Sequence, residues 1–361
     1  MEQLTPATGQ GESLPAHERV PLRFNGEGSE YFGIWIVNLV LSILTLGIYS
    51  AWAKVRRLKY FYRNTRLADG GFDFHASPVN VLKGRIIGLG LFLVYNYIWN
   101  FSIIAGFVVL AVLMVIVPPL LRSALRFRMV NSSYRGLRFG FNGDLRGAYE
   151  VFLFYPLLCL ITLYLLVPYA HRQIRRYQGN HSWYGSAGFN FDAAVGSFYK
   201  IYLVCFGLLL LGPIAMAGLG GFGGMLADAQ DPERVQEFVT RFLVLGVLVF
   251  VLMYLLIQPY YTSRFQNLIW NNLKLDDRLH FESALPVRAL FWVQLTNMIG
   301  LILTLGLFKP WADVRVARLR IESINAVTES GDLESFVNDP RLSESAVGAE
   351  TADFFDFDIG L

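Results

Sequence analysis

The chain has 361 residues, of which 54% are hydrophobic and only 16% are charged, and its mean hydropathy is +0.42. A soluble domain carries about 25% charged residues, so this composition excludes an ordinary soluble protein and predicts a polytopic α-helical membrane protein. The formal net charge of +3 hides an uneven distribution, because residues 322–361 contain ten Asp or Glu and one Arg. The rest of the chain then holds 30 basic and 18 acidic residues, a net charge of +12.

These charge balances divide the chain into three parts. Residues 1–20 are rich in Gly, Pro, Glu and Thr and are expected to form a disordered tail. Residues 21–321 form the membrane domain, and residues 322–361 form an acidic C-terminal tail. Basic residues beside apolar runs are typical of topology signals and of contacts with anionic lipid headgroups. We therefore expect membrane lipids as partners, and no nucleic acid.

The first apolar run, residues 31–53, contains a motif that returns near the end of the chain. Residues 38–56 match residues 297–315 at a constant offset of 259, and ten of the nineteen positions are identical. Two unrelated apolar helices would repeat Leu and Ile, but not polar and aromatic residues in register. The identical positions of the first copy are Asn38, Ile43, Leu44, Thr45, Leu46, Gly47, Trp52, Ala53, Val55 and Arg56.

A basic helix and a β-hairpin follow each apolar run. Residues 64–74 alternate around Asp69-Gly70-Gly71, which is typical of a hairpin. The same plan recurs at 131–141, 181–191 and 271–281, and residues 24–26 form a truncated copy. Because an isolated hairpin is marginally stable, we expect the copies to pair into a small cytoplasmic sheet. The membrane domain is thus predicted to consist of five repeated units of apolar run, basic helix and hairpin.

The spacing of apolar residues predicts about seven membrane spans, and two topologies fit them. If all basic segments are cytoplasmic, as the positive-inside rule requires, the three shorter runs must be re-entrant; otherwise seven simple spans break the rule. Bends are available at Thr45-Leu46-Gly47, at Thr304-Leu305-Gly306 and at Tyr155-Pro156. The spans are 32–52, 85–99, 102–121, 149–170, 198–217, 239–260 and 289–308.

Polar and small residues inside the first and last apolar runs are the candidates for a path or for helix packing. A side-chain amide in hydrocarbon needs a partner, so it either joins helices or lines a path. The threonines are expected to bond a carbonyl one turn earlier, and the glycines to allow a bend or close packing. The candidates are Asn38, Thr45, Gly47, Asn297, Thr304 and Gly306.

Four residues at the ends of the same runs are predicted to anchor the helices at the membrane interface: Trp52, Arg56, Trp311 and Arg315. Lys54 and Asp313 occupy the same repeat position with opposite charge, and we expect them to face each other if a pseudo-two-fold axis relates the repeats.

No motif for catalysis, cofactor binding or metal binding is present in the sequence. There is no HExxH, P-loop or GxSxG, and the five histidines are scattered. We therefore expect no enzyme and no cofactor. The repeated spans with Asn, Thr and Gly favour a transporter- or channel-like protein with a path between its repeats for a small solute. The alternative is a non-enzymatic membrane scaffold or lipid-organising protein with a cytoplasmic β-sheet.

Several motifs match a known family over residues 22–361. They are Tyr31-Phe32, Asn38, Thr45-Leu46-Gly47-Ile48-Tyr49, Trp52-Ala53-Lys54-Val55-Arg56, Asn64-Thr65 and Asp356-Phe357-Asp358-Ile359-Gly360-Leu361. With these motifs the sequence resembles the YjgN-like bacterial inner-membrane family, a domain-of-unknown-function family. The resemblance implies a multi-pass protein of the bacterial cytoplasmic (inner) membrane and supplies no activity.

Overall fold

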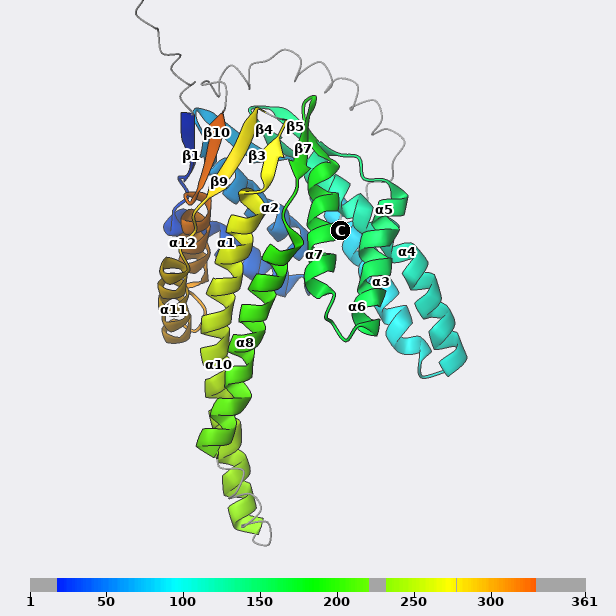
Figure 1. Ribbon diagram of the computed structural model, residues 1–361, viewed down its shortest axis with the longest axis vertical. Helices are drawn as coiled ribbons and strands as arrows, with labels where there is room; N and C mark the ends of the chain where they lie inside the picture. The colour runs from blue at the N-terminus through cyan, green and yellow to red at the C-terminus, as the bar shows by residue number, and fades with distance from the viewer. Residues whose placement is uncertain (1–17, 221–231, 277, 329–361) are drawn as a thin grey trace, which may run out of the picture.

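The computed structural model describes residues 18–220, 232–276 and 278–328, in which ten antiparallel strands close into a barrel above a set of helices (Figure 1). The order around the barrel is β1-β10-β9-β8-β7-β6-β5-β4-β3-β2. The strands are β1 (Glu18–Phe24), β2 (Thr65–Leu67), β3 (Gly70–Phe74), β4 (Ser132–Tyr134), β5 (Leu137–Phe141), β6 (Ser182–Tyr184), β7 (Ala187–Phe191), β8 (Leu273–Leu275), β9 (Leu279–Ser283) and β10 (Ile324–Thr328).

Five units of strand, helical hairpin and strand build this barrel. The first and last strands of each unit pair with each other, as β1 does with β2 and β3 with β4. Tight turns then join the last strand of one unit to the first strand of the next. Arg135 and Gly136 of one turn have φ of 47° and 81°, as tight hairpin turns require. The repeat that the sequence displays is therefore a geometric repeat around one ring.

The predicted hairpins are present and pair with one another, and the sheet that they form is a closed barrel. Closure depends on β10, which pairs with β9 on one side and with β1 on the other. This strand lies within residues 322–361, the stretch that the sequence analysis assigned to the acidic tail. The sequence contained one hint of this strand. The truncated first copy of the hairpin pattern supplies β1 without the second strand of its hairpin, and β10 takes that place beside β1.

The helices run from the barrel in pairs, and in four of the five pairs a described turn joins their far ends (Figure 1). Each pair belongs to one unit, and in the third unit a π-helix, η1, interrupts the first member. The helices are α1 (Gly28–Leu44), α2 (Ser50–Arg63), α3 (Pro78–Ile98), α4 (Ile103–Val130), α5 (Leu145–Tyr149), η1 (Glu150–Phe154), α6 (Tyr155–Ile161), α7 (Val167–Asn180), α8 (Val195–Gly220), α10 (Pro232–Trp270), α11 (Val287–Leu303) and α12 (Lys309–Ile321).

Four helices of the described chain, rather than seven, are long and apolar enough to cross a membrane. They lie in α3, α4, α8 and α10, at 78–98, 103–130, 195–218 and 235–270. In each of the three shorter runs, which the sequence analysis also counted as spans, a helix ends at a turn that leads into the next helix. Their hairpins turn back well before the far end of α8 and α10 (Figure 1). Four helices of spanning length are also what the sequence alternative with three re-entrant runs contains; apolar composition alone did not choose between the two topologies, because it does not reveal a turn inside a run.

The turn in the first unit explains how a short apolar run reverses its direction. Thr45 ends α1, and Leu46 and Gly47 follow with φ of 49° and 90°. The amide N–H of Gly47 donates to the carbonyl of Ser42 at 2.7 Å, which is a Schellman motif. The Thr45 hydroxyl donates to Leu41 O at 2.7 Å and accepts from the amide of Tyr49 at 2.9 Å. The backbone groups at the turn are thus satisfied within the hairpin.

The last and the third units repeat this turn. Thr304 bonds Gly300 O at 2.7 Å and the amide of Phe308 at 2.9 Å, and Leu305 has φ of 51°. In the third unit the bend lies at Thr162, and Leu163 and Tyr164 have φ of 49° and 66°. Tyr155-Pro156, the bend that we expected, lies instead at the start of α6. The shared signal is the Thr-Leu dipeptide, which all three turns contain.

Candidate functional site: the cavity inside the barrel

A cavity of about 470 Å³ lies inside the barrel and extends to the helix ends next to it. Alternate residues of the strands line it, because successive side chains of a strand point to opposite faces. Most of this lining is aromatic or aliphatic. The strand residues are Leu22, Leu67, Phe72, Ser132, Tyr134, Phe139, Phe141, Ser182, Tyr184, Phe189, Phe191, Leu273, Leu275, Leu279 and Phe281.

The end of the cavity next to the hairpin turns is filled by side chains. Leu67, Tyr134, Tyr184, Leu275 and Leu279 lie there and are at most 6% exposed. The Tyr134 hydroxyl donates to Leu67 O at 2.9 Å, and the Tyr184 hydroxyl donates to Tyr134 O at 3.1 Å. Burial raises the pKa of Tyr184, so its hydroxyl stays protonated and remains a donor. This layer closes the barrel at its outer end.

Two arginines lie at the other end, where the helices meet the strands. Arg128 of α4 and Arg175 of α7 both line the cavity. Arg175 donates from Nε to His171 Nε2 at 3.2 Å and from a terminal nitrogen to Gln178 Oε1 at 3.1 Å. Since arginine has no acceptor, His171 Nε2 carries no proton, and Nδ1 can donate to the Tyr202 hydroxyl at 3.1 Å. The imidazole is therefore neutral.

Several basic side chains lie around Arg128, and no carboxylate of the described residues pairs with them. Lys54 lies close enough to Arg85 and Arg128 for their charges to repel its own. Arg175 likewise experiences the charge of Arg128. Arg85 donates to the Ser50 hydroxyl, a neutral partner. Within the described part of the chain, none of these four cations forms an ion pair with a carboxylate.

The two asparagines singled out in the sequence lie between helices and do not line this cavity. Asn297 is 5% exposed; its Nδ2 donates to Ala312 O at 3.2 Å, and its Oδ1 accepts from Arg315 at 2.8 Å. It thereby joins α11 to α12 within one unit. Asn38 is 7% exposed, and its Oδ1 has no hydrogen-bond partner among the residues that the structure describes. Arg56, the equivalent of Arg315, instead lies over the Tyr49 ring at 5.7 Å.

The two tryptophans pack against protein at different places in the ring. Trp311 lies 5.1 Å from Phe32, measured between ring centroids, and a Cβ at Gly28 would approach its ring to 2.2 Å. It therefore packs the last unit against the first. Trp52 stacks on Tyr49 at 6.1 Å and packs on the core cluster that includes Val55.

The predicted pairing of Lys54 with Asp313 is wrong. Asp313 accepts a hydrogen bond from Lys309 of its own helix, and Arg57 of α2 lies 3.9 Å away. The first and last units do meet here, but a residue one helical turn further along α2 carries the facing charge.

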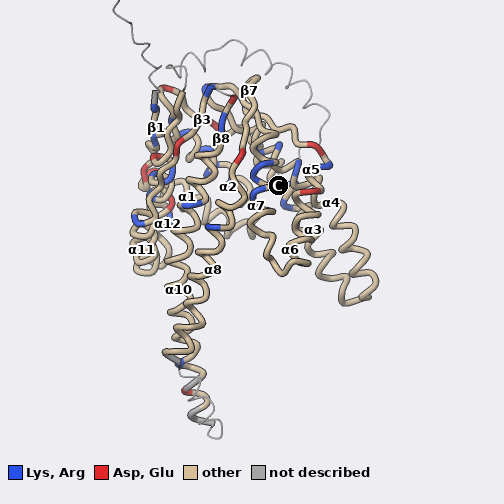
Figure 2. Tube along the Cα trace, viewed as in Figure 1, with Lys and Arg blue, Asp and Glu red and all other residues tan. Residues whose placement is uncertain are grey.

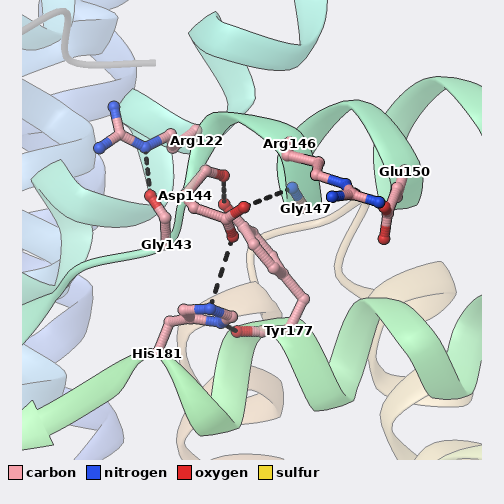
Figure 3. A network of polar contacts seen from close by, with 8 residues as sticks. All are labelled: Arg122, Gly143, Asp144, Arg146, Gly147, Glu150, Tyr177 and His181. Atoms are coloured by element: carbon pink, nitrogen blue, oxygen red, sulfur yellow. Dashed lines mark hydrogen bonds and ion pairs between the residues drawn. The ribbon is translucent and has the colours of Figure 1, made fainter.

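A second hollow, of about 350 Å³, lies between α5, η1 and α7, and its polar groups already satisfy one another (Figure 3). Asp144 accepts from Gly147 N at 3.0 Å, and its Oδ1 lies 3.6 Å from His181 Nε2. Tyr177 donates to Asp144 O at 2.8 Å, as Tyr60 does to Glu27 O in the first unit. Because the contact recurs, we assign this network to the packing of the ring.

Arginine contacts between successive units also recur. Arg122 donates to Gly143 O (Figure 3), Arg172 to Ala193 O at 2.5 Å, and Arg318 to Gly26 O at 2.8 Å. Each arginine lies on the second helix of a unit, and each carbonyl precedes the first helix of the next. Among the described residues, no group of three or more His, Cys, Asp or Glu could hold a metal ion.

The sequence analysis missed the cavity residues for two reasons. It treated the basic segments beside the apolar runs, which include Arg128 and Arg175, only as topology signals and lipid contacts. It also used the hairpins only as a repeat, although the alternation of residues within each strand was a signal for one inward face. Only closure of the barrel brings residues from nine strands around one volume.

The different surroundings of the two asparagines lead to a stability prediction. Asn297→Ala should lower the free energy of unfolding by about 1–3 kcal/mol, because it leaves Arg315 and the Ala312 carbonyl without a buried partner. Asn38→Ala should cost clearly less, since it removes an oxygen that has no partner. Thermal unfolding of both purified variants in the same detergent compares them. Equal losses would contradict the assigned hydrogen bonds.

Comparisons with known proteins place the chain among bacterial membrane proteins. The family model "Bacterial protein of unknown function (DUF898)" matches residues 19–354. Inner membrane protein YjgN of Salmonella typhimurium is 25% identical, over 90% of this chain and 92% of the relative. Inner membrane protein YjgN of Escherichia coli K12 is 30% identical, over 42% of this chain and 37% of the relative. No solved structure matches.

These relatives confirm the family resemblance and the location that it implies. The chain is an inner-membrane protein of bacteria with several candidate transmembrane helices. The matched region includes all ten strands and every helix described above, so the barrel and its helices are features of the family region. The chain belongs to the DUF898 family of bacterial proteins of unknown function.

Proposed function

We propose that this protein is a carrier-like membrane protein whose five units enclose a binding cavity on a path between the repeats. The cavity inside the barrel is the observation that supports this proposal. Its volume of about 470 Å³ falls in the range of ~300–1,000 Å³ that small-molecule sites occupy. An apolar lining with a few polar groups at one end is also typical of such sites. A scaffold alone would gain stability from filling this volume with side chains.

The barrel is placed on the cytoplasmic side in this proposal. Lys and Arg are concentrated in the barrel and the adjoining helix ends, whereas the far halves of α3, α4 and α8 carry no charged residue and the far end of α10 carries both signs (Figure 2). The positive-inside rule then puts all five units on the same side. Four helices cross the membrane, and the three short hairpins are re-entrant.

The tips of the short hairpins fit this arrangement. Leu46, Leu163 and Leu305 are 95%, 83% and 95% exposed, which suits contact with lipid acyl chains. Re-entrant backbone is tolerated where its polar groups are satisfied within the protein, and the Thr45 hydroxyl provides this at the first turn. Because the outer end of the cavity is filled, a ligand would enter from the helix side. The cavity then corresponds to an occluded stage of a path.

Trp270 lines the cavity and offers a direct test of ligand binding. Methyl 11-bromoundecanoate is an uncharged chain whose bromine quenches tryptophan fluorescence on contact. We expect saturable quenching of the purified protein in zwitterionic nanodiscs. The difference between the native chain and Trp270→Phe isolates the signal of this one residue from quenching at lipid-facing tryptophans.

Filling the cavity should remove the binding. Leu125→Phe/Leu273→Phe, at two lining residues outside the filled layer, is expected to weaken the Trp270 signal at least about 10-fold, by occupying volume that the ligand's chain needs. Leu303→Phe/Leu307→Phe makes the same exchange at a lipid-exposed tip and should leave the signal unchanged. Leu125→Phe alone serves if the double variant fails to fold. Absence of saturable quenching in the native protein would favour the scaffold alternative.

A further inference from the structure

We propose that the ligand of the barrel cavity is a single-chain amphipathic anion. Its alkyl or acyl chain would lie among the aromatic residues of the barrel, and its carboxylate or phosphate would bind Arg128 and Arg175. This inference rests on the proposed function and names the chemical class that the cavity takes.

The arginines argue for an anion. Both line the cavity, and the bonding partners of Arg175 are neutral, His171 Nε2 at 3.2 Å and Gln178 Oε1 at 3.1 Å. Lys54 and Arg85 add positive charge near Arg128. Uncompensated guanidinium groups beside an apolar volume are costly, and an acidic group accepts two parallel hydrogen bonds from one guanidinium. An anion at this position would therefore be stabilised by several donors.

The rest of the lining argues against a polar solute. The Ser132 hydroxyl donates to Arg128 O at 2.8 Å, and the Ser182 hydroxyl donates to Gln178 O at 2.6 Å. The side-chain oxygen of Gln178, Oε1, accepts a hydrogen bond from Arg175. These groups already form hydrogen bonds within the protein, so they are poorly placed to form hydrogen bonds with the hydroxyl groups of a sugar. The lining residues include no Asp, Glu or Lys, which also leaves a cation without a partner.

The position of the charges fits an amphipath. Arg128 lies four residues before β4 begins, and Arg175 lies on α7, which leads into β6. Both are therefore at the junction of helices and barrel, while Phe72, Phe139 and Phe189 lie within the strands. A small hydrated anion would leave the aromatic volume unused, and an uncharged chain would leave the arginines unpaired. A molecule with an apolar chain and one acidic end satisfies both.

Three probes of equal chain length test the charge: 11-bromoundecanoate, 11-bromoundecyl phosphate and methyl 11-bromoundecanoate, each measured by quenching of Trp270 in zwitterionic nanodiscs. We expect the native protein to bind at least one anion about 10- to 100-fold more tightly than the ester, from charge-assisted hydrogen bonds. Arg128→Gln/Arg175→Gln should lose this preference and still bind the ester. Tighter binding of the carboxylate or of the phosphate distinguishes a fatty acid from a phosphate headgroup as the source.

Matched variants make each outcome decisive. Arg19→Gln/Arg146→Gln removes two exposed guanidinium groups outside the cavity and should keep the full preference. Arg128→Lys/Arg175→Lys should keep part of it, because charge remains while the two-pronged geometry is lost. Equal binding of ester and anions by the native protein would overturn the anion assignment and leave the cavity intact. If no probe binds, the proposed function fails together with it.

Discussion

Removal of β10 is expected to abolish the fold. A chain that ends at Ser323 loses the strand that closes the barrel, and both β1 and β9 become open edges. It also loses the burial of Ile324 and Val327, each worth about 1.5–3 kcal/mol. Together with the lost hydrogen bonds this amounts to about 5 kcal/mol or more, comparable with the whole stability of a typical domain.

A chain that ends at Thr328 is the matched control. It retains all ten strands and lacks only residues 329–361. The measurement is thermal unfolding in detergent, together with the fraction that elutes as a single species in size-exclusion chromatography. We expect the control to unfold at a temperature close to that of the full chain, and the shorter chain to aggregate. A cooperative transition in the chain that ends at Ser323 would show that barrel closure is dispensable.

Reporter fusions at the hairpin turns are expected to report the same side of the membrane at every unit. Fusions after residues 70, 137, 183 and 276 should all report the cytoplasmic side, because the turns lie at one end of the barrel. Fusions after residues 100 and 218 should report the periplasm, since α3 and α8 carry the chain across the membrane.

The contrast expected is all-or-none, which makes this experiment sensitive. Alkaline phosphatase is active only in the periplasm and green fluorescent protein folds only in the cytoplasm, so the two reporters give opposite signals at each site. A periplasmic signal after any of residues 70, 137, 183 or 276 would contradict the re-entrant hairpins and restore a topology with simple spans.

Some features of the fold could be predicted because they are encoded locally. The alternation of residues 64–74 and its copies marks strands, and the identity between 38–56 and 297–315 marks a repeat. The Thr-Leu-Gly bend at 45–47 is equally local, since Thr45 Oγ1 and the positive φ of Leu46 and Gly47 involve neighbours along the chain. Composition alone was sufficient for the membrane class.

Other features depended on contacts between distant residues. β10 pairs with β1, and Val327 faces Arg19 about 300 residues away, so no local pattern could place it. The bend at Thr162 was hidden because Tyr164 stands where the other turns have Gly. Asn38 and Asn297 are equivalent in sequence, yet only Asn297 is bonded by its arginine. The difference arises from the orientation of the arginine side chain, since Arg315 reaches Asn297 whereas Arg56 lies over the Tyr49 ring.

The sequence by itself determined that this is a membrane protein, that it is built from repeated units, and that each unit carries strands and basic residues. These properties follow from hydropathy, periodicity and identity, which need no knowledge of partners. The tertiary structure alone decided how many runs are long enough to cross, that the hairpins close into a ring, and that an apolar cavity with two arginines lies inside it. A ring closes only when its first and last strands meet, and that contact is a property of the whole chain.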